Sequence, residues 1–297
     1  MVLEQSASHS FWSVRLLGKG KKCGNVIAYV VVSLLLIVGC FWGYGKILEV
    51  PKRQVDILFL GDSLIGQHRD ETSIPYLVGE QLEMSVYNGA FGGTCMSKIN
   101  VGEERTLRKE GLNFISLARA IAYDDFRVQQ ATVIREPATE HFAQVVDEME
   151  QIDFENLKYL ILEYGTNDYF AGVPVNNQRD PYDAYTFEGA LRSSLEILRK
   201  SLPDVQIILI SPTYNWYLNT METCENKEFG GGYLSEYVDV ISQIAEEYGM
   251  EYIDLYTDFY PRTAIEEALI YTSDGIHPNV DGRVKIAHAI AEYIENK

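Results

Sequence analysis

Short apolar runs, each ending at a turn-forming residue, recur along most of this chain and constrain its fold more than any other feature. These runs are nearly continuous in hydrophobicity and rich in β-branched residues, which predicts strands buried on both faces. Stretches between them carry apolar residues at helical spacing. We therefore predict a three-layer α/β/α sandwich around a five-stranded parallel sheet. The predicted strands are Val55–Leu60, Ser85–Tyr87, Tyr159–Tyr164, Val205–Ile210 and Glu251–Leu255, and the predicted helices are Ile74–Met84, Phe187–Ser201, Leu234–Tyr248 and Val280–Glu295.

The alternation is interrupted after the second predicted strand. Residues 97–156 contain no convincing strand but two helical patterns, Leu112–Tyr123 and Glu140–Met149, so we interpret them as a helical insertion. The tyrosine-rich segment Tyr169–Tyr185 contains one glycine and two prolines and is predicted to be a loop.

The first 53 residues differ from the rest in charge. They carry seven basic and two acidic side chains, whereas the whole chain has a formal net charge of −18, so the remainder carries −23. A domain this acidic is poorly suited to a phosphate backbone, and we expect no nucleic-acid partner.

A membrane segment is predicted within this basic head. No charged residue lies between Cys23 and Gly45, and about 20 apolar helical residues suffice to cross a bilayer. The basic residues just before the segment favour a cytoplasmic N-terminus. The predicted organisation is a cytoplasmic N-terminus (1–25), a transmembrane signal anchor (26–45), a linker (46–53) and an extracytoplasmic domain (54–297) held at the cell membrane.

Three other interpretations of this apolar segment remain open. It could be a buried core helix or a cleaved signal peptide, although Phe41 and Trp42 disfavour cleavage at small residues. The sequence Ile37-Val38-Gly39-Cys40 also resembles a bacterial lipobox, in which Cys40 would be lipidated. The signal anchor and the lipoprotein both leave the domain outside the cytoplasm and fixed to a membrane.

Cysteine and histidine spacing predicts neither a metal site nor a cofactor. No CxxC or HExxH pattern occurs. Cys95 and Cys224 both lie in the acidic body, and whether they pair is left open, because sequence does not give the separation of their Cα atoms.

Reactive or turn-forming residues follow the first three predicted strands. Ser63 comes directly after the first strand, where it could expose its hydroxyl or cap a helix. The second strand leads into a glycine-rich loop ending in Gly92-Gly93, whose backbone amides could approach a ligand. Asn167 follows the third strand and could donate a hydrogen bond to developing negative charge or form a turn. All three groups follow the carboxyl ends of their strands, and ligands of open α/β sheets bind at the carboxyl edge.

A fourth group lies near the C-terminus. Asp274 and His277 are three residues apart in a turn built around Gly275 and Pro278, so the carboxylate could orient the imidazole. His68, five residues after Ser63, is the alternative base.

Taken in order, these four blocks resemble the SGNH (GDSL-type) hydrolases over most of residues 54–297. The resemblance implies a flavodoxin-like SGNH hydrolase fold with Ser63 as nucleophile, His277 as general base and acid, and Asp274 as the orienting carboxylate. It also implies an oxyanion hole made by the Ser63 amide, the Gly93 amide and the Asn167 side chain.

Gly93 is chosen over Gly92 because it lies five residues after Asn88, as the corresponding family glycine usually does. The insertion at 97–156 departs from compact members of the family.

The resemblance leads us to predict a serine esterase that forms an acyl-enzyme, with O-acetyl groups on extracellular or cell-wall carbohydrate as its substrate. Tyrosines in the Tyr169–Tyr185 and Tyr214–Tyr217 segments could stack on sugar rings or could simply be structural. The alternatives are a lipase or phospholipase, an acyltransferase, or a membrane-tethered glycan-binding module without activity. The expected partners are a glycan or small-molecule ester and the membrane.

Overall fold

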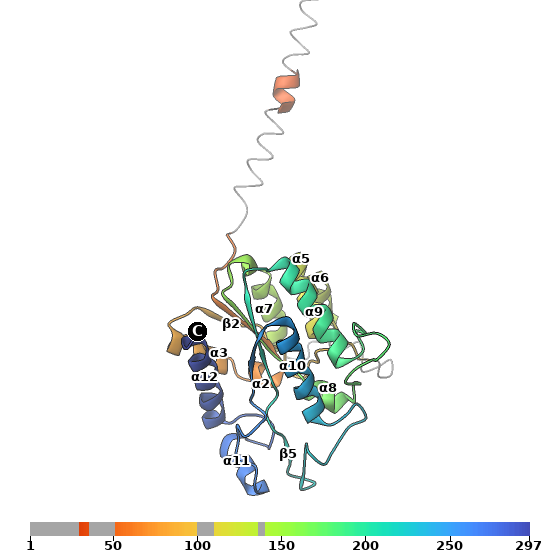
Figure 1. The fold of residues 1–297 in the computed structure, drawn as a ribbon. Helices are drawn as coiled ribbons and strands as arrows, with labels where there is room; N and C mark the ends of the chain where they lie inside the picture. The colour runs from red at the N-terminus through yellow and green to blue at the C-terminus, as the bar shows by residue number, and fades with distance from the viewer. Residues whose placement is uncertain (1–29, 36–50, 100–109, 136–139) are drawn as a thin grey trace, which may run out of the picture. The chain divides into compact units, whose positions relative to one another are not determined.

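The computed structural model describes residues 30–35, 51–99, 110–135 and 140–297 (Figure 1). Two compact units are distinguished, Met1–Pro51 and Lys52–Lys297. Residues 30–35 of the first unit are helical. Most of the predicted anchor at 26–45, including Cys40, lies outside the described residues. Within the described ranges, no helix has the length and hydropathy needed to span a membrane.

The second unit is built on a five-stranded parallel sheet with strand order β2-β1-β3-β4-β7. This is the doubly wound order of flavodoxin-like folds. After β1 the chain places β2 on one side of it and β3 on the other. All five predicted strands are confirmed, with ends that differ by at most two residues. They are β1 (Ile57–Gly61), β2 (Val86–Asn88), β3 (Tyr159–Glu163), β4 (Gln206–Ile210) and β7 (Glu251–Ile253).

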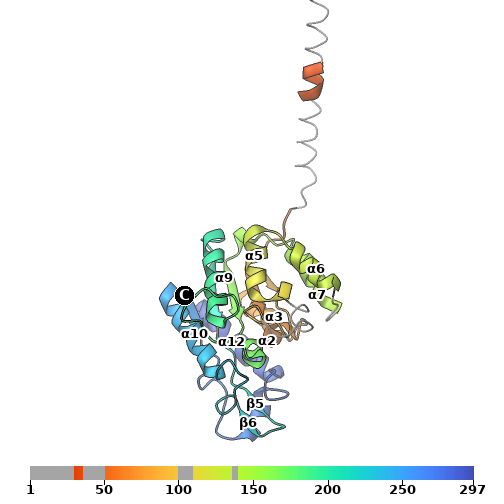
Figure 2. The ribbon, with the colours of Figure 1, turned by 90° about the vertical axis from the view of Figure 1, so that its right-hand side faces the viewer.

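Helices cover both faces of the sheet and complete a three-layer sandwich (Figures 1 and 2). On one face α3 packs along α12, and on the other α5 packs along α9 with α10 beside it. The apolar stripes of these helices and the apolar strands form one continuous buried core. The helices are α3 (Ile74–Leu82), α5 (Phe114–Tyr123), α9 (Phe187–Ser201), α10 (Leu234–Tyr248) and α12 (Val280–Glu295).

The described part of the region predicted as an insertion contains three α-helices. Two of them, α5 and α7 (Glu140–Met149), match the predicted patterns, whereas α6 (Arg127–Arg135) was missed because its mostly polar sequence has no regular apolar stripe. Tyr87 on β2 donates a hydrogen bond from its hydroxyl to the Val145 carbonyl of α7 (3.3 Å), so α7 covers the edge of the sheet.

The remaining elements are short. Residues Tyr169–Ala171 belong to a helix, so the predicted loop Tyr169–Tyr185 begins only at Gly172. The Tyr214–Tyr217 segment likewise ends in a strand of a small antiparallel hairpin rather than in a loop. These elements are α2 (Ser63–Gly66), α8 (Thr166–Ala171), α11 (Ala268–Tyr271), β5 (Trp216–Tyr217), β6 (Glu222–Thr223), η1 (Glu110–Leu112), η2 (Phe154–Asn156) and η3 (Ile265–Glu267).

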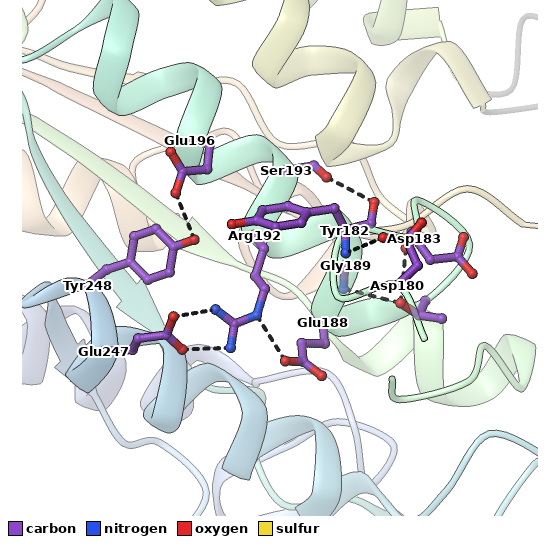
Figure 3. A network of polar contacts seen from close by, with 11 residues as sticks. Asp180, Tyr182, Asp183, Glu188, Gly189, Arg192, Ser193, Glu196, Glu247 and Tyr248 are labelled. Atoms are coloured by element: carbon purple, nitrogen blue, oxygen red, sulfur yellow. Dashed lines mark hydrogen bonds and ion pairs between the residues drawn. The ribbon is translucent and has the colours of Figure 1, made fainter. Parts of the chain in front are cut away.

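A polar network joins α9 to α10 (Figure 3). Arg192 on α9 donates two hydrogen bonds to Glu247 on α10 (2.7 and 2.6 Å) and one to Glu188 on its own helix (2.9 Å). The loop before α9 is attached to the same helix, since the Ser193 hydroxyl donates to the Tyr182 carbonyl (3.1 Å). The bond from Ser193 to Tyr182 therefore holds the loop between α8 and α9 against α9.

Candidate active site

The candidate site lies at the carboxyl ends of β1, β2 and β3. β2 and β3 pair with opposite edges of β1, so the chain crosses over in opposite directions at this place. Such a switch point leaves a crevice between loops and is the usual ligand site of doubly wound sheets. The structure thus places the residues that follow the first three strands at one edge of the sheet.

Ser63 is the first residue of α2, and Asp62 is the N-cap. The Asp62 carboxylate accepts a hydrogen bond from the Leu64 amide (2.9 Å), which satisfies one of the unpaired donors of the first turn. Asp62, and not Ser63, is therefore the residue that caps α2. Its hydroxyl is left available for other contacts, and its side chain is partly exposed.

A hydrogen-bonded chain links Ser63 to His277 and Asp274. Ser63 Oγ lies 3.0 Å from His277 Nε2, and His277 Nδ1 lies 2.7 Å from Asp274 Oδ2. An ionised carboxylate only accepts hydrogen bonds, so Nδ1 carries the imidazole proton and Nε2 is left to accept the serine proton. The sequence-predicted triad is thus assembled from residues 214 positions apart in the chain.

The Asp274 carboxylate is held in its charged form. Burial raises its pKa, but the side chain of His277 and the backbone amides of His277 and Ile276 donate hydrogen bonds that outweigh burial and leave the pKa below its usual value. Asp274 therefore stays ionised near neutral pH and can fix the tautomer of the imidazole.

The turn between Asp274 and His277 depends on a glycine. Gly275 has φ +92°, and a Cβ added there would lie 2.4 Å from the Trp216 carbonyl oxygen. The Trp216 amide donates to the Gly275 carbonyl (2.8 Å), which ties the turn to the β5–β6 hairpin. Only glycine fits both the backbone conformation and this close approach.

Arg283 on α12 supports the same turn from its other side. Arg283 is 5% exposed, and its guanidinium donates to the Pro278 carbonyl (3.0 Å) and to the carbonyl and hydroxyl of Thr72 (2.8 and 2.9 Å). The turn that carries His277 is therefore attached to α12 and to the segment before α3.

The glycine-rich loop after β2 lies against Ser63. A Cβ built on Gly92 would be 3.7 Å from Ser63 Cβ, so the peptide that leads into Gly93 is next to the serine. Gly93 has φ +72°, a conformation that favours glycine. Asn88 fixes the start of the loop by donating from Nδ2 to the Ile65 and His68 carbonyls (3.1 and 3.2 Å).

Asn167, at the start of α8, points toward the same place. Its Nδ2 donates to Asp62 Oδ2 (2.8 Å), so the cap of α2 also orients the side chain that follows β3. One of the two amide protons is used in this bond, and the second can serve a ligand. Together, Ser63 and Asn167 offer donors from two helix starts.

The sequence matches the GDSL-like lipase/acylhydrolase family over residues 59–284, a span that contains all four blocks. This chain belongs to that family. A search of curated proteins finds no match.

Solved structures share the fold of this GDSL-family chain. A protein from Lactobacillus plantarum is 19% identical, with a TM-score of 0.54, and the match covers 84% of this chain and 99% of that one. A possible lipase from Chitinophaga pinensis is 17% identical, with a TM-score of 0.54 and coverage of 82% and 98%. Likeness at such identity concerns the fold alone.

Three buried acids beneath the GDSL-family site were not singled out from the sequence. Asp62 directly precedes Ser63, and Asp168 follows Asn167. Glu163 interrupts an otherwise apolar strand, and that polar residue in a buried strand was the one available signal.

Asp168 connects two of the blocks. Its carboxylate accepts hydrogen bonds from the Met96 amide (2.7 Å), the Ser97 amide (3.1 Å) and the Ser97 hydroxyl, so α8 is fastened to the glycine-rich loop. Burial raises the pKa of Asp168 to about 6, and these three donors oppose the rise.

The remaining candidates take no part in this arrangement. His68 lies near His277 but makes no side-chain hydrogen bond to Ser63, whose partner is His277. Cys95 and Cys224 are both buried and are not joined by a disulfide. In the described part of the chain, no group of three or more His, Cys, Asp or Glu is placed to hold a metal ion.

Proposed function

We propose that this protein is a serine esterase that hydrolyses carboxylic esters through an acyl-enzyme on Ser63, with O-acetyl groups of carbohydrates as its substrates. The observation that carries the proposal is the hydrogen-bonded chain Ser63–His277–Asp274, set beside two helix starts at the switch point of the sheet. The arrangement provides a nucleophile, a base and an orienting carboxylate in direct contact.

In the proposed mechanism, Ser63 Oγ attacks the ester carbonyl carbon while its proton passes to His277 Nε2. The negative charge that forms on the carbonyl oxygen is stabilised by the Ser63 amide, the Gly93 amide and Asn167 Nδ2. Collapse of the intermediate breaks the bond to the alcohol, which leaves with the proton from His277. Water then attacks the acyl-enzyme, gives a proton to His277 and releases the acid, and the proton returns to Ser63.

A cavity with several polar side chains in its lining supports carbohydrate as the substrate class. It has a volume of about 670 Å³ and lies at the C-terminal end of α8, the helix whose first turn carries Asn167. At about 1.5 Å per residue, its wall at Ala171 is only some 6 Å along the helix from Asn167. Amide, charged and phenol groups line much of it and suit the hydroxyls of a sugar: Lys98, Asn176, Asn177, Gln178, Asp183 and Tyr185.

The tyrosines divide between this cavity and the core. Tyr185 lines the cavity and is 46% exposed, so its ring is available to a ligand. Tyr169 and Tyr214 are buried in aromatic contacts and are structural. The proposal that a tyrosine contacts sugar therefore rests on Tyr185 alone among these three.

The proposed location is outside the cytoplasm at a membrane, through the apolar segment at 26–45 or through a lipid on Cys40. Its support is the sequence: a basic flank before an uncharged apolar stretch. Membrane fractionation of the full chain, repeated after Cys40→Ser, tests it: loss of the membrane fraction in the variant favours the lipid, and a soluble wild type contradicts both forms of anchoring.

The experiment that tests the function compares wild type and Ser63→Ala on an acetyl aryl ester, with circular dichroism as the folding control. We expect hydrolysis to vanish in the folded variant, and unchanged turnover would contradict the serine mechanism. A panel of O-acetylated glycans, assayed for acetate release beside long-chain lipid esters, then tests the substrate class. Preference for long-chain esters would favour a lipase, and acyl transfer to sugar hydroxyls an acyltransferase.

The cavity is tested by removing exposed side chains on its lining. Gln178→Ala and Asn176→Ala should raise KM for an acetylated oligosaccharide and leave kcat/KM for a small aryl acetate unchanged. Lys200→Ala, at the exposed end of α9 outside the cavity, is the control. Equal effects on both substrates would contradict the assignment.

A further inference from the structure

Glu163 is a carboxyl group in an environment that disfavours its charge. It ends β3 after three buried apolar residues, has 0% exposure, and its carboxyl group interacts with the side chain and the backbone amide of Asp62. A buried carboxylate with few donors is strongly disfavoured relative to the neutral acid. Burial raises the pKa of Glu163 well above its usual value, and the charge of Asp62 raises it further. Both effects favour the protonated form of Glu163.

Its nearest acidic neighbour is the cap of α2. Gly61 and Glu163 are paired in the sheet, and a Cβ on Gly61 would lie 3.4 Å from Glu163 Oε2. The Glu163 carboxyl thus lies over the end of β1, immediately before Asp62, and Asp62 is the acceptor toward which its acid proton is directed.

The two acids differ in their donors. Asp62 accepts hydrogen bonds from the Leu64 amide and from Asn167 Nδ2, whereas at Glu163 burial and the charge of Asp62 outweigh the one opposing donor, the Asp62 backbone amide. When two buried carboxyls lie together, the first negative charge settles on the better solvated one and the second ionisation is suppressed. Burial raises the pKa of both acids, and the donors to Asp62 oppose that rise, so we expect the single charge of the pair on Asp62 and the proton on Glu163.

We propose that Glu163 is a positioning residue for the oxyanion hole: as a neutral acid beside the Asp62 carboxylate, it keeps that carboxylate single-charged and turned toward Asn167. The proposal rests on the proposed function, in which Asn167 binds the oxyanion. Loss of the Glu163 proton to solvent at alkaline pH would place a second negative charge under the site. That charge repels Asp62 and opposes the negative charge of the tetrahedral intermediate.

Two other acidic groups lie close to Asp62 and Glu163, and neither titrates in the same way as Glu163. Asp168 on α8 has a pKa of about 6 and is already charged at alkaline pH. Burial raises the pKa of Tyr164, the next residue in the chain, well above its usual value. His277 interacts electrostatically with Asp62, and Cys95 with Tyr164. On β4, the apolar Ile210 is paired with Glu163.

The test is the pH dependence of kcat for an acetyl ester in wild type, Glu163→Gln and Glu163→Ala. Glutamine keeps a neutral donor of the same shape, so we expect kcat of Glu163→Gln within about twofold of wild type at neutral pH. We expect kcat of the wild type to fall at alkaline pH and kcat of Glu163→Gln not to fall there. Alanine removes the donor and should lower kcat about tenfold with little change in KM, a smaller loss than the roughly 10²–10³ of deleting an oxyanion donor.

Leu162→Ala is the matched control, because it truncates an equally buried neighbour on β3 without touching the acid pair. It should lower the melting temperature but keep kcat and the pH profile at temperatures where it is folded. A Glu163→Gln profile that declines like the wild type, or equal kcat losses in Glu163→Ala and Leu162→Ala, would overturn the positioning role. If Ser63→Ala retains activity, the proposed function fails instead, so the two failures are distinguishable.

A measurement on the unaltered protein remains decisive if the variants do not fold. With glutamate labelled by ¹³C at its carboxyl carbon, one resonance should stay at the protonated position at neutral pH and move only in alkaline solution, together with the fall in kcat. Finding every glutamate resonance at the carboxylate position at neutral pH would overturn the proposal.

Discussion

Replacing Gly275 by alanine should damage both stability and activity, because the turn it occupies holds His277 against Ser63. A residue with a Cβ pays about 1–2 kcal/mol for a left-handed conformation, and Gly275 has φ +92°. The new Cβ would also lie 2.4 Å from the Trp216 carbonyl oxygen. Relieving that overlap breaks the hydrogen bond from the Trp216 amide to the Gly275 carbonyl, which is worth about 1 kcal/mol.

The expected destabilisation is therefore about 2–3 kcal/mol, or roughly 5–10 °C in melting temperature for a domain of this size. A displacement of the turn by about 1 Å would lengthen the 3.0 Å contact between Ser63 and His277 and lower kcat about 10²-fold. Urea unfolding measures the first effect and steady-state hydrolysis of an aryl acetate the second.

Gly249→Ala is the matched control for this variant. Gly249 also has a positive φ (+63°), at the end of α10, but a Cβ there would meet no atom within 4 Å. It should lose about 1 kcal/mol and keep full activity. If Gly275→Ala loses no more stability than this control and keeps wild-type kcat/KM, the reasoning about the turn is refuted.

Three further predictions concern single residues of the site. Asp274→Asn should lower kcat by at least about 10²-fold, since the neutral amide no longer stabilises the imidazolium; a loss below threefold in steady-state assays would contradict it. Asn167→Ala should lower kcat about 10²-fold with little change in KM, whereas a rise in KM alone would remove Asn167 from the oxyanion hole. Asp168 has a raised pKa, so the folded state binds its proton more tightly and the stability contributed by this group falls as pH rises from about 4 to 6. Urea unfolding across that range should show Asp168→Asn gaining stability relative to wild type, and a constant difference would contradict the assigned pKa.

The layers of the fold could be predicted from sequence because the strands and helices carry strong, regular apolar patterns. Phe187–Ser201, Leu234–Tyr248 and Val280–Glu295 coincide with α9, α10 and α12, since amphipathic repeats of four turns fix both ends. α6 was missed because its helix depends on packing against its neighbours and not on an apolar stripe of its own.

Ser63, Asn167, Asp274 and His277 could be named from the sequence, but the buried acids beneath them and the contacts of those acids could not. Ser63 and Asn167 were recognisable because each follows a strand, whereas the hydrogen bond from Asn167 to Asp62 spans 105 positions and has no local signature. The same holds for the contact between the Asp62 and Glu163 side chains, which arises only when β1 and β3 pair. Long-range polar contacts of this kind depend on the register of the sheet.

The central claim, that Ser63 attacks an ester and carries the acyl group, is tested most directly by intact-protein mass spectrometry after rapid acid quench of a reaction with an aryl acetate. We expect a transient gain of one acetyl group, mapped by peptide fragmentation to Ser63, absent in Ser63→Ala and strongly reduced in His277→Ala. Product release from the wild type with no acetylated protein at any quench time, or acetyl groups mapped to another residue, would contradict it.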